Sequence, residues 1–474
     1  MSNSRRLSRR SFLKTAGSGI AAAGVAPMFI PSHVFGANDR VNLAIVGIRG
    51  RGGSHINAFG PMENVHIHSL VDIDMNLFAD RTGEIREKFS YEPQTQQDFR
   101  RVLDNPDIDG VTFATPNHWH ALGSIWAAQA GKHVYVEKPS SHGVWEGRQM
   151  VNAARKHDVV MQVGFQNRSR RNTRAAMELL HSGGIGRVYL CRGLCYRDRP
   201  NIGLYPDGPL APGEQYALTV GSRSYLGPYT PDYLSRVDYD MWVGPAAMRP
   251  FNRNRFHYNW HWQWEYGNGD TGNQGPHQFD VGRWGLNKHE YPVRVSSFGG
   301  LFGEPSAQDT PNVQTTLLEY ADGTLFEFST RGMPTNTEAE IGVGNTFYGT
   351  EGRLEIDGGG NWKTFMGRRS EPGRNSDEIE AAAYDPNDAL GSGDQGHFGN
   401  FVAAIRAGSS KDLTCDIEEG HRSSVLAHIG NIAYRVRREL RFDDATERFV
   451  GDEEANALLR RTERAPYAVP AIST

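Results

Sequence analysis

The chain has little cysteine. Its 474 residues include three cysteines, Cys191, Cys195 and Cys415. Cys191 and Cys195 lie four positions apart in a β-patterned run, and that spacing along a strand separates them by roughly 13 Å, too far for a disulfide. We therefore expect neither a disulfide framework nor a cysteine metal site.

Long hydrophobic runs and excess positive charge are also missing. The apolar run at residues 20–30 is shorter than the roughly 20 residues that a membrane helix requires. The formal net charge is −4, and the first 37 residues carry five basic side chains and no acidic one. Taking those five charges away leaves −9 for the rest of the chain. This balance argues against nucleic acid or an anionic membrane as a partner.

An export signal begins the chain. Residues 8–14 read S-R-R-S-F-L-K, which matches the twin-arginine pattern S-R-R-x-F-L-K, and a weakly apolar run follows. The twin-arginine export machinery carries folded proteins, often with a cofactor bound. We predict a signal peptide at residues 1–37, cleaved near Gly36 or Ala37, and a periplasmic or secreted protein. A retained signal anchor is the alternative.

Residues 38–164 alternate short apolar runs with amphipathic stretches. Strands are expected at residues 41–46, 65–71, 111–114, 133–136 and 159–163. This alternation predicts an α/β Rossmann domain, in which helices cover both faces of a doubly wound parallel sheet.

The pattern changes in residues 165–440. Strands are expected at residues 187–196, 293–299, 313–320 and 324–329, and helices at residues 172–181 and 417–440. Between them lies a long tract rich in Pro, Gly and Tyr, residues 197–259, and loops of this length are uncommon unless functional. We predict an α+β domain with a large, mainly antiparallel open sheet, followed by a C-terminal tail at residues 441–474.

A glycine-rich turn follows the first strand. It reads Gly47-Ile48-Arg49-Gly50-Arg51-Gly52 and departs from the dinucleotide fingerprint G-x-G-x-x-G at Arg49. Gly47 permits a tight turn, Gly50 and Gly52 let backbone amides approach a pyrophosphate, and Arg49 or Arg51 adds a cation. A turn without a ligand is the alternative.

Asp72 ends the second predicted strand, 25 positions after Gly47. A carboxylate at this point accepts a hydrogen bond from a ribose 2′-hydroxyl and repels a 2′-phosphate, which favours NAD over NADP. The alternative is that Asp72 caps the next helix.

Two further strands end in polar residues. One runs into Thr115-Pro116-Asn117 and His120, and the next into Glu137-Lys138-Pro139. Ligands gather at the carboxyl ends of strands in open α/β sheets. A buried lysine there donates to a substrate hydroxyl, whereas a solvated charge is the alternative for Lys138.

With these motifs the sequence resembles the glucose–fructose oxidoreductase / inositol dehydrogenase (Gfo/Idh/MocA) family over about residues 41–440. Glu137-Lys138-Pro139 matches the hallmark tripeptide of that family, and the resemblance implies that Lys138 lies beside the nicotinamide and the substrate. Thr115, Pro116, Asn117 and His120 match the segment around the nicotinamide.

A second family signature, D-x-x-x-H-x-x-D, falls at residues 273–280. His277 and Asp280 match it, but Asn273 replaces the first aspartate, which leaves the substrate unassigned. By residue type, His277 is the base for a hydroxyl proton. Lys138 as ammonium steadies alkoxide charge. Asn273 bonds a neighbouring hydroxyl, and Asp280 orients the imidazole.

The aromatic segment 258–266 runs into this signature. Trp260 and Trp262 are candidates for stacking on sugar rings, and a half-buried alternating strand is the other interpretation. His257, His261 and His277 lack the spacing of metal ligands, so we expect no metal.

These features predict an exported NAD-dependent oxidoreductase acting on the secondary hydroxyl or keto group of a sugar, glycoside or cyclitol, with a tightly held cofactor. The alternative is an NAD-dependent glycosidase that oxidises a ring carbon transiently, eliminates the aglycone and re-reduces the ring. The resemblance also implies a homo-oligomer, a dimer or tetramer, because in that family the open sheet face often meets another subunit.

Overall fold

The computed structural model describes residues 40–208, 219–220, 223–224, 231–379 and 393–473. The predicted twin-arginine segment lies outside the described residues. The chain divides into two units, residues 1–40 and 41–474, and the second contains all the elements below. Within the described residues, no helix is long and apolar enough to span a bilayer.

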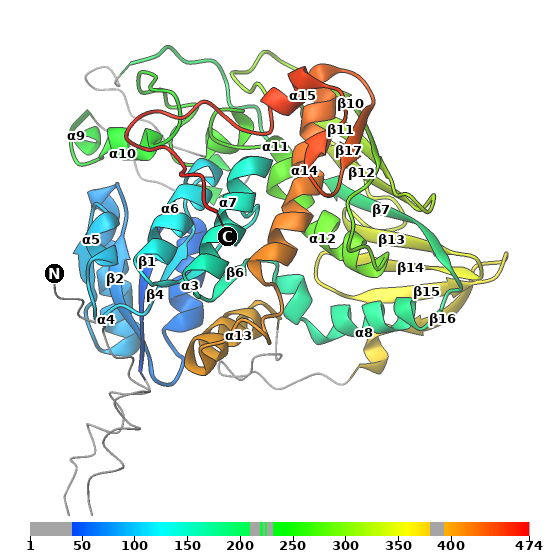
Figure 1. The fold of residues 1–474 in the computed structure, drawn as a ribbon, viewed down its shortest axis with the longest axis horizontal. Helices are drawn as coiled ribbons and strands as arrows, with labels where there is room; N and C mark the ends of the chain where they lie inside the picture. Colours follow the sequence, from blue (N-terminus) through cyan, green and yellow to red (C-terminus); the bar gives the residue numbers. More distant parts are fainter. Residues whose placement is uncertain (1–39, 209–218, 221–222, 225–230, 380–392, 474) are drawn as a thin grey trace, which may run out of the picture. The chain divides into compact units, whose positions relative to one another are not determined.

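The first sheet is parallel and has the strand order β3-β2-β1-β4-β5-β6. Its strands are β1 (Val41–Val46), β2 (Val65–Val71), β3 (Gln94–Gln96), β4 (Gly110–Phe113), β5 (His133–Val136) and β6 (Met161–Val163). The intervening helices are α3 (Gly50–Phe59), α4 (Phe78–Phe89), α5 (Arg100–Leu103), α6 (Asn117–Gln129) and α7 (Val144–Lys156). Apolar residues of β1 are buried on both of its faces, as expected when helices cover both sides of a sheet. The predicted doubly wound sheet is confirmed (Figure 1).

The second sheet is mainly antiparallel. Among the described residues its order is β16-β15-β14-β13-β7-β12-β11-β10-β17-β18, and only the pair β7–β12 is parallel. Its strands are β7 (Val188–Tyr196), β10 (Arg294–Gly300), β11 (Val313–Glu319), β12 (Leu325–Arg331), β13 (Val343–Gly349), β14 (Gly352–Asp357), β15 (Trp362–Met366), β16 (Glu371–Asn375), β17 (Leu440–Asp443) and β18 (Arg448–Phe449). The predicted class is confirmed, although the sequence did not reveal β13 to β16.

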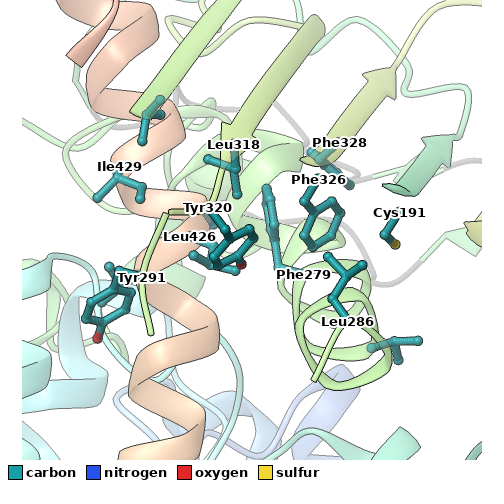
Figure 2. Close-up of a cluster of buried hydrophobic side chains, with 14 of the residues drawn as sticks. Cys191, Phe279, Leu286, Tyr291, Leu318, Tyr320, Phe326, Phe328, Leu426 and Ile429 are labelled. Carbon is teal, nitrogen blue, oxygen red and sulfur yellow. The ribbon is translucent and has the colours of Figure 1, made fainter. Parts of the chain in front are cut away.

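Helices cover one face of this sheet. They are α8 (Arg171–His181), α12 (Gly275–Gly285) and α14 (Ile417–Val436). Figure 2 shows Phe279 of α12 and Leu426 of α14 packed against Phe326 and Leu318 of the strands. On the other face Phe298 is 72% exposed and Leu317 43%, and no described helix covers them.

The late part of the chain returns to the first sheet. α13 (Gly393–Ala407) packs against α3, and its Phe398 and Phe401 join the core beneath β1. After α15 (Glu453–Ala457) the tail crosses towards α7, and Tyr467 and Ile472 enter the core on the other side of the sheet (Figure 1). The first sheet therefore depends on segments remote in sequence, and the domain limits remain a prediction.

The long tract after β7 has few regular elements. Those described are β8 (Thr219–Val220), β9 (Arg223–Ser224), α9 (Pro231–Leu234) and α10 (Tyr239–Val243). At its end follow η3 (Asn259–Trp262) and then α11 (Gly269–Asn273). The remaining short helices are η1 (Met75–Leu77), η2 (Gln166–Ser169) and η4 (Ser376–Glu378). The aromatic segment thus begins with a 3-10 turn, not with the strand of the alternative interpretation.

Candidate functional site

A pocket lies at the carboxyl ends of β1, β2 and β4. Of the residues that the motifs predict, those that line it are Gly47, Arg49, Asp72, Thr115, Pro116 and Trp260. The other lining residues are Val46, Val71, Ile73, Gln97, Phe99, Phe113, Ala114, Trp119, Met241, Trp242 and His257. The glycine turn, the strand-end acid and the Thr-Pro segment therefore meet in one pocket, which we call the dinucleotide pocket.

Two glycines allow the close packing of the turn. Gly47 has φ +83°, and a Cβ there would lie 2.8 Å from the carbonyl oxygen of Ala114. A Cβ on Gly52 would lie 1.8 Å from the carbonyl oxygen of Gly47. A side chain at Gly47 would collide with the residue that follows β4, and a side chain at Gly52 would push α3 away from the end of β1. The close packing of the turn therefore requires glycine at both positions.

The carboxylate of Asp72 is bonded to the glycine-rich turn. Its Oδ2 accepts from the backbone N–H of Ile48 at 2.9 Å, and its Oδ1 accepts from that of Asp74 at 3.0 Å. Burial raises the pKa of Asp72 to about 6, and the bond from Ile48 opposes the rise. The helix cap is Asp74, whose side chain accepts from Asn76, so the alternative role for Asp72 is not observed.

Asp74 anchors the long tract over the pocket. Its carboxylate accepts from the Tyr233 hydroxyl, and His257 Nε2 lies 3.2 Å from Oδ2. Burial would raise the pKa of Asp74, but these two partners outweigh it and lower the pKa. The backbone N–H of Asp238 also donates to Ile73. Met241, Trp242 and His257 thereby become walls of the dinucleotide pocket.

Lys138 meets the second family signature directly. Its Nζ donates to the carbonyl oxygen of Asn273 at 2.8 Å and lies 3.4 Å from the amide Oδ1. Burial lowers the pKa of Lys138 to about 8 against the attraction of Glu137. A lysine with this pKa exchanges its proton near neutral pH, which a solvated surface lysine does not.

Glu137 fixes the strand end behind Lys138. Its buried Oε1 accepts from Arg51 Nε at 2.7 Å, and His55 Nε2 lies 3.1 Å away. Gln166 donates to the same oxygen at 3.3 Å. Arg51, predicted beside a phosphate, is thus bound to a carboxylate, and Arg49 is the arginine that lines the pocket.

The residues after β4 brace the site. His120 lies between two carbonyl oxygens, those of Pro139 at 2.7 Å and Thr115 at 2.9 Å. Asn117 Nδ2 donates to Asn268 Oδ1 at 3.0 Å. His120 therefore holds the turn at Lys138, and Asn117 joins α6 to the signature segment. Ile48 and Gly50 belong to the turn but do not line the pocket.

The mostly buried ion pair of Arg199 and Asp270 acts on the pKa of Lys138, because the charge of Arg199 lowers that pKa and the charge of Asp270 raises it. Arg199 donates to both oxygens of Asp270 at 2.9 and 2.7 Å, and its guanidinium lies 5.2 Å from the Trp262 ring. Trp262 is 4% exposed, so it packs beneath Arg199.

Trp260 stacks on His261 with 3.6 Å between ring centroids. Burial lowers the pKa of His261 to about 3, which keeps this ring neutral.

His277 and Asp280 have different surroundings. His277, four positions after Asn273, is half-buried, and its ring meets Phe165 edge-on at 6.1 Å. Asp280 is fully buried and binds Arg168 at 2.9 and 3.0 Å and Ser423 at 2.6 Å. The carboxylate of Asp280 is thus paired with Arg168, and its predicted role in orienting His277 stays a prediction.

The motifs missed several pocket residues. Met241, Trp242 and His257 come from the long tract, and Gln97 and Phe99 follow β3. The length of the tract was the signal that pointed to Met241, Trp242 and His257, whereas the sequence analysis had no signal for Gln97 and Phe99. Within the described residues, no cluster of three or more His, Cys, Asp or Glu side chains fits a metal ion.

Two family models match the chain. "Oxidoreductase family, NAD-binding Rossmann fold" matches residues 41–165, and "Oxidoreductase family, C-terminal alpha/beta domain" matches residues 224–339 and 388–469. Both describe Gfo/Idh/MocA proteins, and together they cover well over half of the chain.

Curated relatives match over shorter segments. A levoglucosan dehydrogenase of Pseudarthrobacter phenanthrenivorans is 37% identical over 116 residues, 24% of this chain and 30% of the relative. A glycosyl hydrolase family 109 protein of Solibacter usitatus is 29% identical over 31% of this chain and 36% of its own length. A myo-inositol 2-dehydrogenase of Thermotoga maritima is 26% identical over 32% and 44%. The matches thus span less than half the length of these relatives.

Solved structures share the fold over a longer range. A levoglucosan dehydrogenase in complex with NADH and levoglucosan aligns with a TM-score of 0.59 and 21% identity, over 85% of this chain and 99% of that one. An aldose-aldose oxidoreductase from Caulobacter crescentus complexed with glycerol aligns with a TM-score of 0.60 and 17% identity, over 85% and 100%.

Proposed function

The chain belongs to the Gfo/Idh/MocA oxidoreductase family, and on that basis we propose that it is an exported NAD-dependent oxidoreductase of a sugar, glycoside or cyclitol. The reacting group is a secondary hydroxyl or the corresponding ketone. The observation that carries the proposal is the position of the half-buried Lys138. It follows β5, which lies next to β4 in the sheet, and β4 ends in the dinucleotide pocket. The Nζ of Lys138 donates to Asn273 at 2.8 Å. The test is a screen of glycosides, sugars and inositols for NADH formation by wild-type protein.

The dinucleotide pocket suits NAD. Glycine at positions 47 and 52 lets the amino end of α3 approach a pyrophosphate, with Arg49 at the pocket wall. Asp72 would hold the ribose, and the Thr115-Pro116 segment would hold the nicotinamide. When bound, NAD⁺ supplies the acceptor for the hydride of the alcohol carbon.

The side chains of this protein handle the proton. In alcohol oxidation His277 takes the hydroxyl proton, and the Lys138 ammonium stabilises the negative charge that develops on oxygen. Asn273 holds Lys138 in place through its carbonyl oxygen and, at 3.4 Å, its amide oxygen, which leaves the amide nitrogen for a neighbouring hydroxyl. Trp260 and Trp262 remain candidate substrate contacts. The guanidinium of Arg199, which is bonded to Asp270, lies over the ring of Trp262.

We expect the cofactor to stay bound through purification. The contacts of Asp74 with Tyr233 and His257 hold the long tract over the pocket, so release requires them to open. Protein purified from the periplasm should release stoichiometric NAD(H) on denaturation. Asp74→Ala should lose cofactor during dialysis, whereas Asp98→Ala, at the exposed pair with Arg100, should keep it. Wild-type protein that is free of cofactor and binds NAD weakly would contradict this expectation.

We expect Asp72 to decide between NAD and NADP. Asp72→Ala should weaken NAD binding by about 1.5–3 kcal/mol, the value of a hydrogen bond to a charged group. The substitution should also bring the Kd values for NAD and NADP closer together, because the carboxylate no longer repels the 2′-phosphate of NADP. Titration of both cofactors into stripped protein measures the two Kd values. A wild-type preference for NADP would refute the role of Asp72.

We expect a dimer or tetramer built on the open sheet face. Phe298 of β10 and Leu317 of β11 lie exposed there on adjacent strands. Exposed apolar patches of this kind mark interfaces. Light scattering at micromolar concentration should give an oligomer, and Phe298→Glu with Leu317→Glu should shift it towards monomer. A wild-type monomer would count against the interface.

The glycosidase remains the second candidate, because several curated relatives are named glycosyl hydrolase family 109 proteins. A glycosidase that oxidises a ring carbon only transiently returns its hydride to the sugar, so it forms no net NADH. Following NADH absorbance and aglycone release in parallel therefore separates the two activities.

A further inference from the structure

A second cavity lies apart from the dinucleotide pocket. Its volume is about 600 Å³, and its walls come from the start of α7, from α14, from the tract near Trp264 and from tail residues 457–464. Neither Lys138, Asn273 nor His277 lines it. In Figure 1 the tail runs from α15 towards α10 and then turns back towards α7.

The cavity has four arginines in its wall, and two of them have carboxylate partners. Arg460 pairs with Glu463 at 2.9 Å, and Arg464 pairs with Asp240 at 2.7 Å. Within the described part of the chain, Arg435 and Arg461 form no ion pair at this range. The wall therefore holds two cations that no described carboxylate binds.

Of these two arginines, Arg461 gives the stronger indication of an anion-binding site. Its Nη1 donates weakly to the carbonyl oxygen of Glu265 at 3.4 Å, whereas Nε and Nη2 are buried without any partner among the described residues. A buried guanidinium whose donors are unpaired is costly, and an oxyanion satisfies two of them at once. Burial lowers the pKa of Arg461, and the nearby charges of Glu146, Glu265 and Glu463 oppose the shift.

The acids nearest Arg461 are only partly engaged elsewhere. Glu265 accepts from the backbone N–H of Ala247 at 2.8 Å, and Glu463 accepts from Arg460 through Oε2, whereas its Oε1 is buried without a partner among the described residues. Glu146 caps α7 by accepting from the N–H groups of His142 and Gly143. Burial lowers the pKa of His142 and raises that of Glu146 to about 7, so neither adds full charge at neutral pH.

The rest of the wall offers a hydroxyl and an aromatic surface to a sugar ring. Thr462 supplies the hydroxyl and Trp264 the aromatic surface, next to Arg435 at 5.3 Å. The side-chain amides of Asn431 and Asn268 are bonded within the protein. The volume exceeds that of an inorganic anion and accommodates a monosaccharide that carries an acidic group. Arg435 and Arg460 are exposed, which places the entrance beside them.

We propose that this cavity is a second binding site, for a carbohydrate that bears a carboxylate or a phosphate, with Arg461 as the buried anion contact and Arg435 at the entrance. The site is separate from the catalytic centre and does not depend on the proposed reaction.

The test is calorimetric titration of full-length holoprotein with D-glucuronate and with D-glucose 6-phosphate. Binding of either supports the site, and the two arms tell a carboxylate from a phosphate. Arg461→Gln should weaken binding about 10- to 100-fold, the loss expected for a charge-assisted contact. Arg460→Gln is the matched control on the same wall and should change Kd less than about threefold, because Arg460 is engaged by Glu463. Arg435→Gln gives a second, exposed test if Arg461→Gln does not fold.

Lys138→Ala separates this cavity from the catalytic centre. Binding that survives Lys138→Ala but not Arg461→Gln supports the second site. Binding lost only in Lys138→Ala assigns the ligand to the catalytic centre and overturns the proposal. Equal binding of neutral D-glucose overturns anion recognition, and equal binding of inorganic phosphate overturns carbohydrate recognition. No binding of any probe at millimolar concentration means a cavity filled only by water, which also overturns it.

Discussion

Lys138→Ala and His277→Ala should each lower turnover by about 10²–10⁴, the range for a positioned acid or base. Lys138 follows β5 and is bonded to Asn273, and His277 lies four positions after Asn273. Neither side chain belongs to an apolar core cluster, so folding and cofactor content should survive. Steady-state kinetics on a substrate from the screen measures the loss. Lys88→Ala, on the exposed face of α4, is the control and should leave turnover unchanged.

The pH profile identifies the two groups. The Lys138 pKa of about 8 lies below its ordinary value, so the ammonium form is present below pH 8 and is lost as pH rises through it. Turnover that needs the ammonium should therefore fall above about pH 8, and Lys138→Arg should remove that alkaline limb. His277→Ala should remove the acidic limb. Activity that needs neither residue, or a His277→Ala variant with an unchanged profile, would refute the assignment.

Asp280→Ala should give the largest loss of stability. Asp280 is fully buried and binds Arg168 and Ser423, and Arg168 is itself almost fully buried. Removing one partner of a buried ion pair costs about 3–5 kcal/mol, because the remaining charge is left uncompensated. Denaturant unfolding followed by circular dichroism measures the change in the free energy of unfolding.

A control separates this effect from surface charge. Arg374→Ala breaks the exposed pair with Glu378 and should leave the unfolding midpoint unchanged. If Asp280→Ala unfolded like wild type but lost the acidic limb of the pH profile, the result would contradict a structural role and support the predicted role of Asp280 in orienting His277.

The sequence predicted the first sheet well because its signals are local. The run at β1, the glycine turn and Asp72 lie within a short stretch, and together they favour one interpretation although the turn and Asp72 each allow an alternative alone. Glu137 and Lys138 could be placed at a strand end by the same local pattern. Family resemblance then placed Lys138 and the signature at residues 273–280 in one site. The bond between Lys138 and Asn273 spans 135 positions and was found only in the structure, because no periodicity reveals it.

The outer strands of the second sheet were missed for a physical reason. β16 contains Pro372 and Gly373 and is mostly exposed, so its residues show no buried alternation. β13 to β15 carry glycines and charged residues, and β13 pairs with β7, which lies far earlier in the chain. Such strands form because the neighbouring strand supplies their hydrogen bonds, not because of their own pattern.

The ion-pair partners of Arg51 and Asp280 were not predicted, for a related reason. Both are charged residues beside a motif, and sequence spacing suggested a ligand or an imidazole as their partner. Each instead has a buried partner of opposite charge from a remote element, Glu137 for Arg51 and Arg168 for Asp280. Long-range ion pairs of this kind leave no periodic trace.

The most direct test is the screen of sugars, glycosides and inositols on wild-type and Lys138→Ala protein, with NADH absorbance and released aglycone followed together. We predict net NADH formation with at least one CH–OH substrate, at a rate that Lys138→Ala lowers at least about a hundredfold. Aglycone release without net NADH, or turnover that Lys138→Ala leaves unchanged, would contradict the account.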